Sequence, residues 1–274
     1  MGKISKAVIP AAGAGTRFYP LTRAQPKEML PIVDKPVIHY VVEEAVRSGL
    51  DEILIIAGAG KDAIMNYFDH HFLDDRMEDS YFMSLPDIFF VRQKGQLGLA
   101  DAVRCSRSFV GDDPFVVLLG DTIYESGTGE PVTRQIIRRY EELGDPVIAV
   151  ENVPKSKTKD YGMVGGVPVS EGLWLVKNLV EKPSPEEAPS DLGITGIYAL
   201  EPDIFGCIEN LKPGRNGELQ LTDALLEYSK NRRVYASTFK GTRYDIGTKE
   251  LWIKTFIEFT IRDERFRNIL KDIS

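Results

Sequence analysis

The stretch Ala7-Val8-Ile9-Pro10-Ala11-Ala12-Gly13-Ala14-Gly15-Thr16-Arg17, near the start of the chain, is the strongest indicator of its fold class. Its apolar residues predict a buried strand, and its two glycines predict a tight turn at the carboxyl end of that strand. Such a turn exposes backbone N–H groups and lets the backbone approach a ligand without Cβ clashes. Because Arg17 follows at once and Lys27 comes soon after, the sequence predicts a loop that binds a phosphate chain. A tight turn without a ligand is the simpler alternative for the glycines taken alone.

Two better-known phosphate loops do not match this sequence. A dinucleotide fingerprint requires a third glycine for close helix packing, and Phe18 occupies that position. The stretch Gly58-Ala59-Gly60-Lys61 resembles the end of a P-loop, but the first glycine of that motif would fall at Ile55 and its Ser/Thr at Asp62. We therefore interpret this second stretch as an ordinary turn between a strand and a helix.

Short β-branched runs alternate with helix-patterned segments through the first half of the chain. The expected strands are residues 6–10, 52–57, 88–92, 115–119 and 147–150. The expected helices between them are residues 37–48, 61–68, 99–109 and 132–143. This alternation predicts an α/β fold with a Rossmann-like, doubly wound and mostly parallel sheet, whose ligands lie at the carboxyl ends of the strands.

The second half of the chain has a different pattern. Residues 162–169 and 173–180 flank Ser170-Glu171-Gly172, which predicts a hairpin that adds antiparallel strands to one edge of the sheet. A further strand is expected at residues 194–200. A terminal helix is expected at residues 251–269, with an apolar stripe that packs on the core and consists of Trp252, Phe256, Phe259 and Phe266. Residues 70–87 are polar and methionine-bearing, and we interpret them as a flap or an oligomer contact.

The composition excludes several classes of protein. With 274 residues and 43% hydrophobic content, the chain can bury a core of its own. A formal charge of −7 argues against nucleic acid as a partner, whereas a small anionic ligand needs only a local basic pocket. The two cysteines lie far apart, the three histidines form no zinc-ligand pattern, and no apolar run has the length of a signal peptide or membrane span. We therefore expect a soluble, cytoplasmic protein without membrane partners.

Two aspartates stand where a metal could bind. Asp121 follows an expected strand through a single glycine, so its carboxylate projects from the carboxyl end of that strand. Asp245 precedes the terminal helix, where Thr248 can serve as the N-cap. Magnesium is commonly held by one or two carboxylates, substrate phosphates and water. The alternative for Asp121 is a cap of a helix or a turn.

Polar side chains also end two other expected strands. Glu181 and Lys182 precede Pro183, which stops the strand from continuing in a ladder. This pair is either a solvated strand end or a source of a carboxylate for sugar hydroxyls and an ammonium group for a phosphate. Gln93 presents a donor and an acceptor, which suits the imide edge of a pyrimidine, although the spacing alone favours an ordinary turn for a glutamine there.

Four stretches together resemble the sugar-1-phosphate nucleotidylyltransferases. They are Ala11-Ala12-Gly13-Ala14-Gly15-Thr16-Arg17, Pro26-Lys27-Glu28-Met29-Leu30-Pro31, Val180-Glu181-Lys182-Pro183 and Gly217-Glu218-Leu219-Gln220-Leu221-Thr222-Asp223. The resemblance runs almost end to end, and the second stretch, followed by Val33-Asp34-Lys35-Pro36, is most similar to bacterial-type UTP–glucose-1-phosphate uridylyltransferases (UDP-glucose pyrophosphorylases). It implies transfer of a uridylyl group from UTP to glucose 1-phosphate, with UDP-glucose and pyrophosphate as products, and Mg²⁺ as cofactor. We also expect a homo-oligomer.

The resemblance implies a role for each of the matching residues. The residues implied in catalysis are Arg17, Lys27 and Lys182. The nucleotide would be bound by Ala11, Ala12, Gly13, Gly15, Thr16, Glu28, Gln93 and Gly98. The sugar phosphate would be bound by Gly162, Glu181, Lys182, Thr195 and Gly196, and Mg²⁺ by Asp121 and Asp245. We expect one domain over residues 1–274, in which residues 1–150 mainly bind the nucleotide, and residues 151–274 mainly bind the sugar phosphate and include the terminal helix.

Some features depart from the uridylyltransferase pattern. The stretches Gly120-Asp121-Thr122 and Tyr19-Pro20-Leu21-Thr22 look more like the thymidylyltransferase branch, and Asp101 replaces a more familiar His or Gln. The segment 70–87 is also shorter than the usual helical insert. A glucose-1-phosphate thymidylyltransferase, or another sugar-1-phosphate nucleotidylyltransferase, is therefore the alternative enzyme. A non-catalytic nucleotide-sugar sensor is a further alternative, but such a protein has no need of both Asp121 and Asp245.

Overall fold

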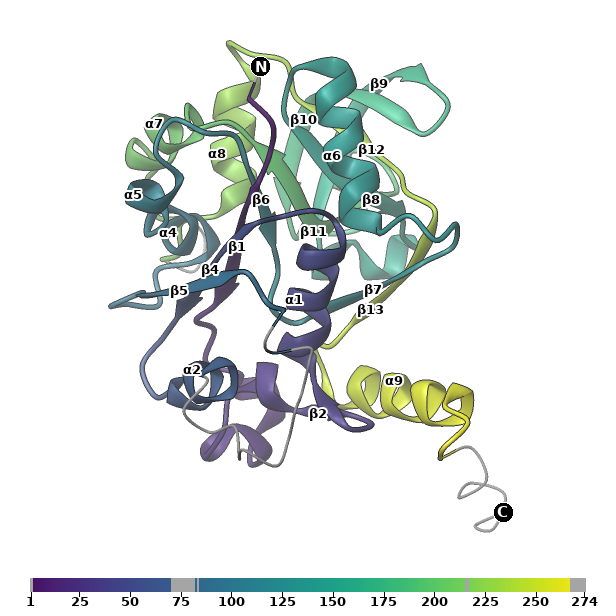
Figure 1. The fold of residues 1–274 in the computed structure, drawn as a ribbon. Helices are drawn as coiled ribbons and strands as arrows, with labels where there is room; N and C mark the ends of the chain where they lie inside the picture. The colour runs from purple at the N-terminus through teal and green to yellow at the C-terminus, as the bar shows by residue number, and fades with distance from the viewer. Residues whose placement is uncertain (1, 70–81, 83, 215–216, 267–274) are drawn as a thin grey trace.

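The structure, a computed structural model, describes residues 2–69, 82, 84–214 and 217–266 (Figure 1). Within these residues, nine strands form one mixed sheet. Their spatial order is β5 (Asp87–Arg92), β4 (Glu52–Ala57), β1 (Lys6–Ala11), β6 (Phe115–Leu118), β11 (Leu192–Leu200), β8 (Val147–Asn152), β12 (Tyr235–Ser237), β10 (Leu173–Glu181) and β9 (Gly162–Ser170). The first four strands are parallel to one another, and so are β8 and β12. The predicted mostly parallel α/β sheet is therefore confirmed.

The strands of the parallel part are apolar because helices cover both faces of the sheet. In β1, Ala7 and Ile9 join one buried cluster, whereas Val8 joins the cluster on the opposite face. This alternation follows from the two-residue period of a strand. The register of β1 with β4, from Lys6 opposite Glu52 to Ala11 opposite Ala57, brings the carboxyl ends of these strands to the same edge.

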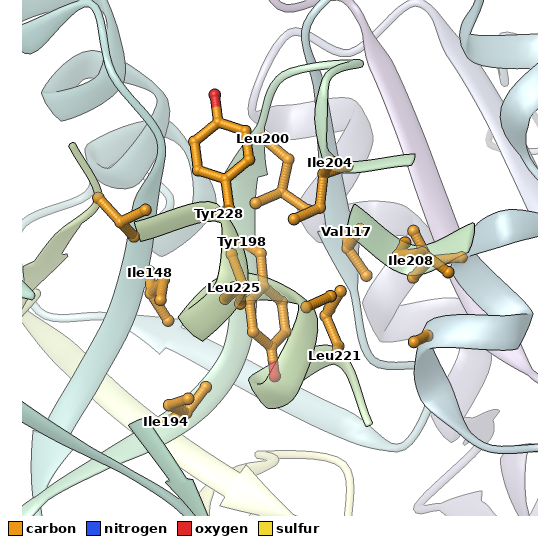
Figure 2. Packing of buried hydrophobic residues seen from close by; sticks show 14 of the residues in the cluster. Val117, Ile148, Ile194, Tyr198, Leu200, Ile204, Ile208, Leu221, Leu225 and Tyr228 are labelled. Carbon is orange, nitrogen blue, oxygen red and sulfur yellow. The ribbon is translucent and has the colours of Figure 1, made fainter. Parts of the chain in front are cut away.

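Helices from both halves of the chain cover the two faces (Figure 1). One face carries α4 (Leu99–Arg104), α7 (Ile204–Glu209) and α8 (Leu221–Ser229). The other face carries α1 (Val37–Arg47), α2 (Asp62–Phe68) and α6 (Val132–Leu143). Figure 2 shows how the first layer packs: Tyr198 and Leu200 of β11 lie among apolar side chains of α7 and α8. Burying each large apolar side chain contributes about 1.5–3 kcal/mol.

A third core cluster anchors the loop after β1 and the terminal helix. It contains Phe18, Leu30, Ile32, Val37, Ile123, Tyr244 and Ile246. Most of these residues come from the first loop and from two short ribbons, formed by β2 (Pro31–Ile32) with β3 (Lys35–Pro36) and by β7 (Thr122–Ser126) with β13 (Gly241–Asp245). Val37 starts α1, and Ile246 follows β13. Trp252, Phe256 and Phe259 of α9 (Lys249–Arg262) pack against it, so the apolar stripe predicted on the terminal helix is core at these three positions.

Most of the predicted elements are present, with shifted ends. The hairpin of β9 and β10 lies at one edge of the sheet, as predicted. The helix predicted at 99–109 is wrong as a single element, because α4 ends at Arg104 and a separate α5 (Arg107–Val110) follows. The hydroxyl of Ser106 donates to the carbonyl of Val103 at the break, 2.6 Å away. The terminal helix ends at Arg262 rather than at residue 269.

Several features lie beyond the sequence-based predictions. The strand predicted at 194–200 is β11, which inserts antiparallel between β6 and β8 in the middle of the sheet.

Most of the segment 70–87, including both adjacent histidines, lies outside the described residues, as do residues 267–269. Both cysteines are free thiols. In the described part of the chain, no helix is both long and apolar enough to cross a membrane.

Candidate active site

A cavity of about 380 Å³ lies where the loops after β1 and β6 face the antiparallel part of the sheet. The predicted site residues that line it are Gly15, Thr16, Arg17, Lys27, Asp121, Gly162, Glu181, Lys182, Thr195 and Asp245. They come from both halves of the chain. The cavity therefore joins the predicted phosphate loop to the predicted sugar-phosphate residues.

The loop after β1 has the backbone that its glycines predict. Gly15 adopts a left-handed conformation with φ of 64° and starts the short 3₁₀ helix η1 (Thr16–Phe18). The hydroxyl of Thr22 donates to the carbonyl oxygen of Gly15 at 2.7 Å and closes the loop. Phe18 is buried in the third core cluster, whereas Thr16 and Arg17 are exposed beside the cavity. The position that lacks the third glycine of a dinucleotide fingerprint is therefore an anchor for the loop.

Lys27 links the loop to the predicted metal ligands. It lies in the 3₁₀ helix η3 (Lys27–Met29), and its ammonium group donates to Oδ2 of Asp121. Its chain passes Gly13, where a Cβ would lie 3.7 Å from Cε of Lys27. Burial lowers the pKa of Lys27, but the neighbouring carboxylates of Asp121 and Glu28 raise it by a larger amount. The pKa of Lys27 therefore lies above its ordinary value. Lys27 is therefore a fixed cation in the site.

Asp121 and Asp245 lie on paired segments of backbone. The N–H of Ile246 donates to the carbonyl of Asp121 at 3.0 Å, and Asp245 of β13 pairs with Thr122 of β7. Burial raises the pKa of Asp245, and the repulsion of Asp121 adds to this against the attraction of Arg243. Two carboxylates thus share a partly buried site.

The donor set in this site suits a metal that also binds the substrate. Among the residues that the structure describes, no group of three or more His, Cys, Asp and Glu side chains is arranged to hold a metal ion. Two carboxylate oxygens beside a phosphate loop are nonetheless the hard ligands that Mg²⁺ takes together with phosphate oxygens and water. The carboxylates of Asp121 and Asp245 therefore fit a Mg²⁺ ion that also binds phosphate oxygens.

Arg243 is a buried cation of the cavity that the sequence-based predictions missed. Its guanidinium group contacts Oε1 of Glu151 at 2.5 Å, Oδ2 of Asp245 at 3.3 Å and the hydroxyl of Tyr161 at 3.1 Å. Although burial lowers its pKa, the carboxylate of Glu151 holds that pKa above the ordinary value. Arg243 and Asp245 are two residues apart on one strand, so their side chains lie on the same face of it. This spacing could have indicated that Arg243 lies in the same site as Asp245.

Glu181 is held in place at the end of β10. Oε2 of Glu181 accepts a hydrogen bond from the hydroxyl of Thr222 at 2.6 Å. Gly162 lies against both groups, because a Cβ there would lie 2.9 Å from Oγ1 of Thr222 and 3.1 Å from Oε2 of Glu181. Lys182 follows with a φ of 46° and its ammonium group 3.2 Å from Oε1 of Glu181. The charged pair is thus part of the cavity wall and not a freely solvated strand end.

Thr195 and Gly196 shape a wall of the cavity at an irregularity in β11. The register of β11 shifts between Ile194 and Tyr198. Oγ1 of Thr195 donates to the carbonyl of Ala149 at 3.1 Å, and the carbonyl of Gly196 accepts from the N–H of Leu119 at 3.1 Å. Gly196 has a φ of 104°, which favours glycine, and a Cβ there would lie 2.8 Å from Cδ1 of Leu119. Thr195 lines the cavity, and Gly196 lies behind it.

Glu28 does not line the cavity. Its side chain is 1% exposed and accepts a hydrogen bond from Nζ of Lys61 at 2.6 Å, and Lys61 is 6% exposed. Burial raises the pKa of Glu28 and lowers that of Lys61. The stretch 58–61 is a turn between β4 and α2, as interpreted, and its lysine forms this buried pair with Glu28. A direct contact of Glu28 with the nucleotide stays a prediction.

The remaining predicted nucleotide residues do not line the cavity. Ala11 and Ala12 are buried at the end of β1, and Gly13 follows them. A Cβ at Gly58 would lie 2.8 Å from the carbonyl oxygen of Ala12, so β1 and β4 approach closely here. Gln93 and Gly98, which belong to the loop after β5, contact each other at 3.2 Å.

Comparison with known proteins assigns the family. A family model described as nucleotidyl transferase matches residues 6–260. The chain belongs to the nucleotidyl transferase family. This nucleotidyl transferase is 45% identical to a UTP–glucose-1-phosphate uridylyltransferase of Staphylococcus haemolyticus over 98% of its own length and 97% of that protein. It is 44% identical to a protein of the same name from Staphylococcus epidermidis over 99% and 97% of the two chains.

Solved structures agree with this assignment. A UDP-glucose pyrophosphorylase in complex with UDP-glucose superposes on the nucleotidyl transferase with a TM-score of 0.90 and 38% identity, over 95% of this chain and 100% of that one. A UTP-bound UGPase from Acinetobacter baumannii gives 0.88 and 34%, over 98% of each chain. A putative glucose-1-phosphate thymidylyltransferase from Bacillus anthracis gives 0.76 and 25%, over 93% and 94%. The resemblance read from the sequence is therefore confirmed.

Proposed function

We propose that this nucleotidyl transferase transfers a uridylyl group from UTP to glucose 1-phosphate and releases pyrophosphate. The observation that carries the proposal is the identity of 44–45%, over nearly the full length, to relatives with that name. The cavity supports it, because a phosphate loop, two carboxylates and a charged pair on the opposite wall meet there. Thymidylyl transfer has less support, since the thymidylyltransferase structure is the more distant of the solved relatives described above.

The chemistry proposed is an in-line displacement. A phosphate oxygen of glucose 1-phosphate attacks the α-phosphorus of UTP, the bond from that phosphorus to the bridging oxygen breaks, and pyrophosphate leaves. The attacking oxygen is already an anion, so the reaction needs no general base. Catalysis then consists of positioning the two substrates and neutralising their charge.

The residues of this chain divide between these tasks. In the proposal, the loop of Gly13, Gly15 and Thr16 presents backbone N–H groups to the triphosphate, while Arg17 and Lys27 neutralise its charge. Lys182 orients the phosphate of glucose 1-phosphate, and Glu181 accepts hydrogen bonds from sugar hydroxyls. Mg²⁺ held by Asp121 and Asp245 would supply Lewis-acid stabilisation of the phosphate oxygens.

The division of the chain and its assembly are also part of the proposal. One domain, with a mainly nucleotide-binding part at 1–150 and a mainly sugar-phosphate-binding part at 151–274, agrees with one sheet built from both halves. A homo-oligomer has support from α9, where Ile253, Ile257 and Ile261 form an exposed apolar row. We place the protein in the cytoplasm. Light scattering on the purified protein tests its assembly.

One assay tests the reaction. Pyrophosphate release is measured with each combination of UTP, dTTP, CTP or ATP and glucose, galactose or N-acetylglucosamine 1-phosphate, with Mg²⁺ present. We expect the highest kcat/KM for UTP with glucose 1-phosphate, and UDP-glucose as the product. Equal or better use of dTTP refutes the assignment to UTP.

A further inference from the structure

We infer that Asp101 sets the hydrogen-bonding direction of the Gln93 amide, so that Gln93 offers the nucleotide only an acceptor and the site rejects cytosine. The inference rests on the proposed function and on the prediction that Gln93 contacts the pyrimidine of the nucleotide. It adds a specificity-determining role for Asp101, a residue that departs from the family pattern.

Gln93 uses both hydrogens of its amide inside the protein. It directly follows β5, and its backbone N–H donates to the carbonyl of Ala57 of β4 at 3.0 Å. Its Nε2 donates to the carbonyl oxygen of Gly98 at 3.2 Å and to Oδ2 of Asp101 at 2.7 Å. A primary amide nitrogen has two hydrogens, so its donor capacity is filled. Within the described part of the chain, Oε1 of Gln93 has no hydrogen-bond partner, and the residue retains 6% exposure.

The contacts of Asp101 exclude the opposite orientation of this amide. Asp101 is 2% exposed, and its Oδ1 accepts from Nη2 of Arg104 at 2.5 Å and from Nε at 3.2 Å. A guanidinium group only donates, and an ionised carboxylate only accepts. Rotating the Gln93 amide would place its oxygen against both Oδ2 of Asp101 and the carbonyl of Gly98. The carboxylate of Asp101 and the carbonyl of Gly98 therefore both fix Nε2 of Gln93 as a donor and leave Oε1 as an acceptor.

The loop that carries these contacts is tied to the cavity wall. The N–H of Leu219 donates to the carbonyl of Leu97 at 2.6 Å, and the N–H of Ala100 donates to the carbonyl of Leu219 at 3.0 Å. Gly98 has a φ of 102°, and a Cβ there would lie 2.5 Å from the Leu219 oxygen. Leu99, Gln220 and Leu221, next to these residues, line the cavity. The loop that holds Gln93 is thus fixed next to residues that line the cavity, although Gln93 itself is not part of the lining.

An acceptor of this kind distinguishes pyrimidines by their N3 position. Uracil and thymine carry a hydrogen on N3, which can donate to Oε1 of Gln93. Cytosine carries a lone pair on N3, so two acceptors would face each other. An unmatched buried polar pair corresponds to a loss of roughly 10-fold to 100-fold in affinity. We therefore expect kcat/KM for UTP to exceed that for CTP by about this factor or more, with no contribution of this contact to the choice between UTP and dTTP.

The decisive variant is Asp101→Asn, which replaces one oxygen of the carboxylate with an amide nitrogen. Arg104 still requires an oxygen, so it retains Oδ1 of the new amide and directs the amide nitrogen toward Gln93. Gln93 then meets a donor at position 101 and still meets the carbonyl acceptor of Gly98. Its amide direction is no longer fixed by both contacts, so Nε2 of Gln93 can face the nucleotide as a donor. We expect the ratio of kcat/KM for UTP to that for CTP to fall at least about 10-fold, through a loss for UTP and a gain for CTP.

Two control variants separate this role from a general effect on folding. Arg104→Met keeps the Asp101 carboxylate and should leave the UTP to CTP ratio within about twofold of wild type. In the background of Gln93→Ala, adding Asp101→Asn should not change the ratio, because the reading group is gone. Thermal unfolding of each variant establishes that the fold is intact.

A measurement on the unaltered enzyme needs no variant to fold. UTP methylated at N3 has no hydrogen there, so it should be used as poorly as CTP. Equal use of UTP and CTP by the wild type, or an unchanged ratio in Asp101→Asn, overturns the inference. A wild-type enzyme without activity on UTP and glucose 1-phosphate instead overturns the proposed function.

Discussion

Lys61→Met should destabilise the protein by breaking its buried ion pair with Glu28. The two side chains are 6% and 1% exposed, so the remaining carboxylate of Glu28 has no access to bulk water. Removing one partner of a buried ion pair costs about 3–5 kcal/mol where the other charge stays uncompensated. Lys27 also attracts the carboxylate of Glu28, so we expect the loss for Lys61→Met to lie at the lower end of this range. An exposed pair is worth only about 0–1 kcal/mol. Lys230→Met is the matched control, since Lys230 and Glu227 form a salt bridge on the surface.

The loss should depend on pH in a defined direction. Burial already raises the pKa of Glu28 in the folded protein, and removing the cation of Lys61 raises it further. A carboxyl group whose pKa is higher in the folded state contributes stability below its unfolded pKa, and that stability is lost as the pH rises through the folded pKa. The deficit of Lys61→Met relative to wild type should therefore be larger at pH 8 than at pH 5.

Urea unfolding at these two pH values measures the effect. The double variant Lys61→Met with Glu28→Gln replaces both charges and should recover most of the stability lost at pH 8, because no uncompensated charge remains. If the single and double variants are equally stable at pH 8, or if Lys61→Met costs no more than Lys230→Met, the reasoning from the buried pair is refuted.

Three other predictions concern the reaction. Activity should require a divalent cation, and Asp121→Asn should reduce kcat by about 100-fold or more, on the scale of several kcal/mol of metal-ion stabilisation; full turnover in excess chelator or by Asp245→Ala would contradict this. Arg17→Ala should mainly raise KM for UTP, and Lys182→Ala should mainly raise KM for glucose 1-phosphate. Each increase should be roughly 10-fold to 100-fold, because each variant loses a charge-assisted hydrogen bond. Initial-rate kinetics with each substrate varied in turn measures both values. A site that hydrogen-bonds the ribose 2′-hydroxyl discriminates more strongly against a nucleotide that lacks this hydroxyl than against one that carries an extra methyl group. We therefore expect kcat/KM to be low for dUTP and dTTP and largely retained for 5-methyl-UTP. Good use of dUTP would oppose this.

Local pattern was sufficient for the parts of the fold that depend on neighbours in the chain. The apolar run of β1, its glycine turn and the alternation of strands and helices predicted an α/β sheet with a ligand at its carboxyl edge, and the structure has that sheet. Thr248 was expected to cap the terminal helix, and its Oγ1 accepts from the N–H of Leu251 at 3.3 Å. Periodicity and capping act over a few residues, so one sequence reveals them.

Contacts between distant segments were not predictable in this way. The position of β11 between β6 and β8 depends on which strand edges remain for pairing, and no local pattern specifies that choice. The same holds for Lys61 with Glu28, 33 residues apart, and for Arg243 with Glu151, 92 residues apart. Side-chain direction follows from local geometry, but the partner that a charge meets depends on how the whole sheet closes around it. The motifs were therefore enough to predict many of the residues that line one cavity, while the buried ion pairs are determined only when distant segments of the chain pack together.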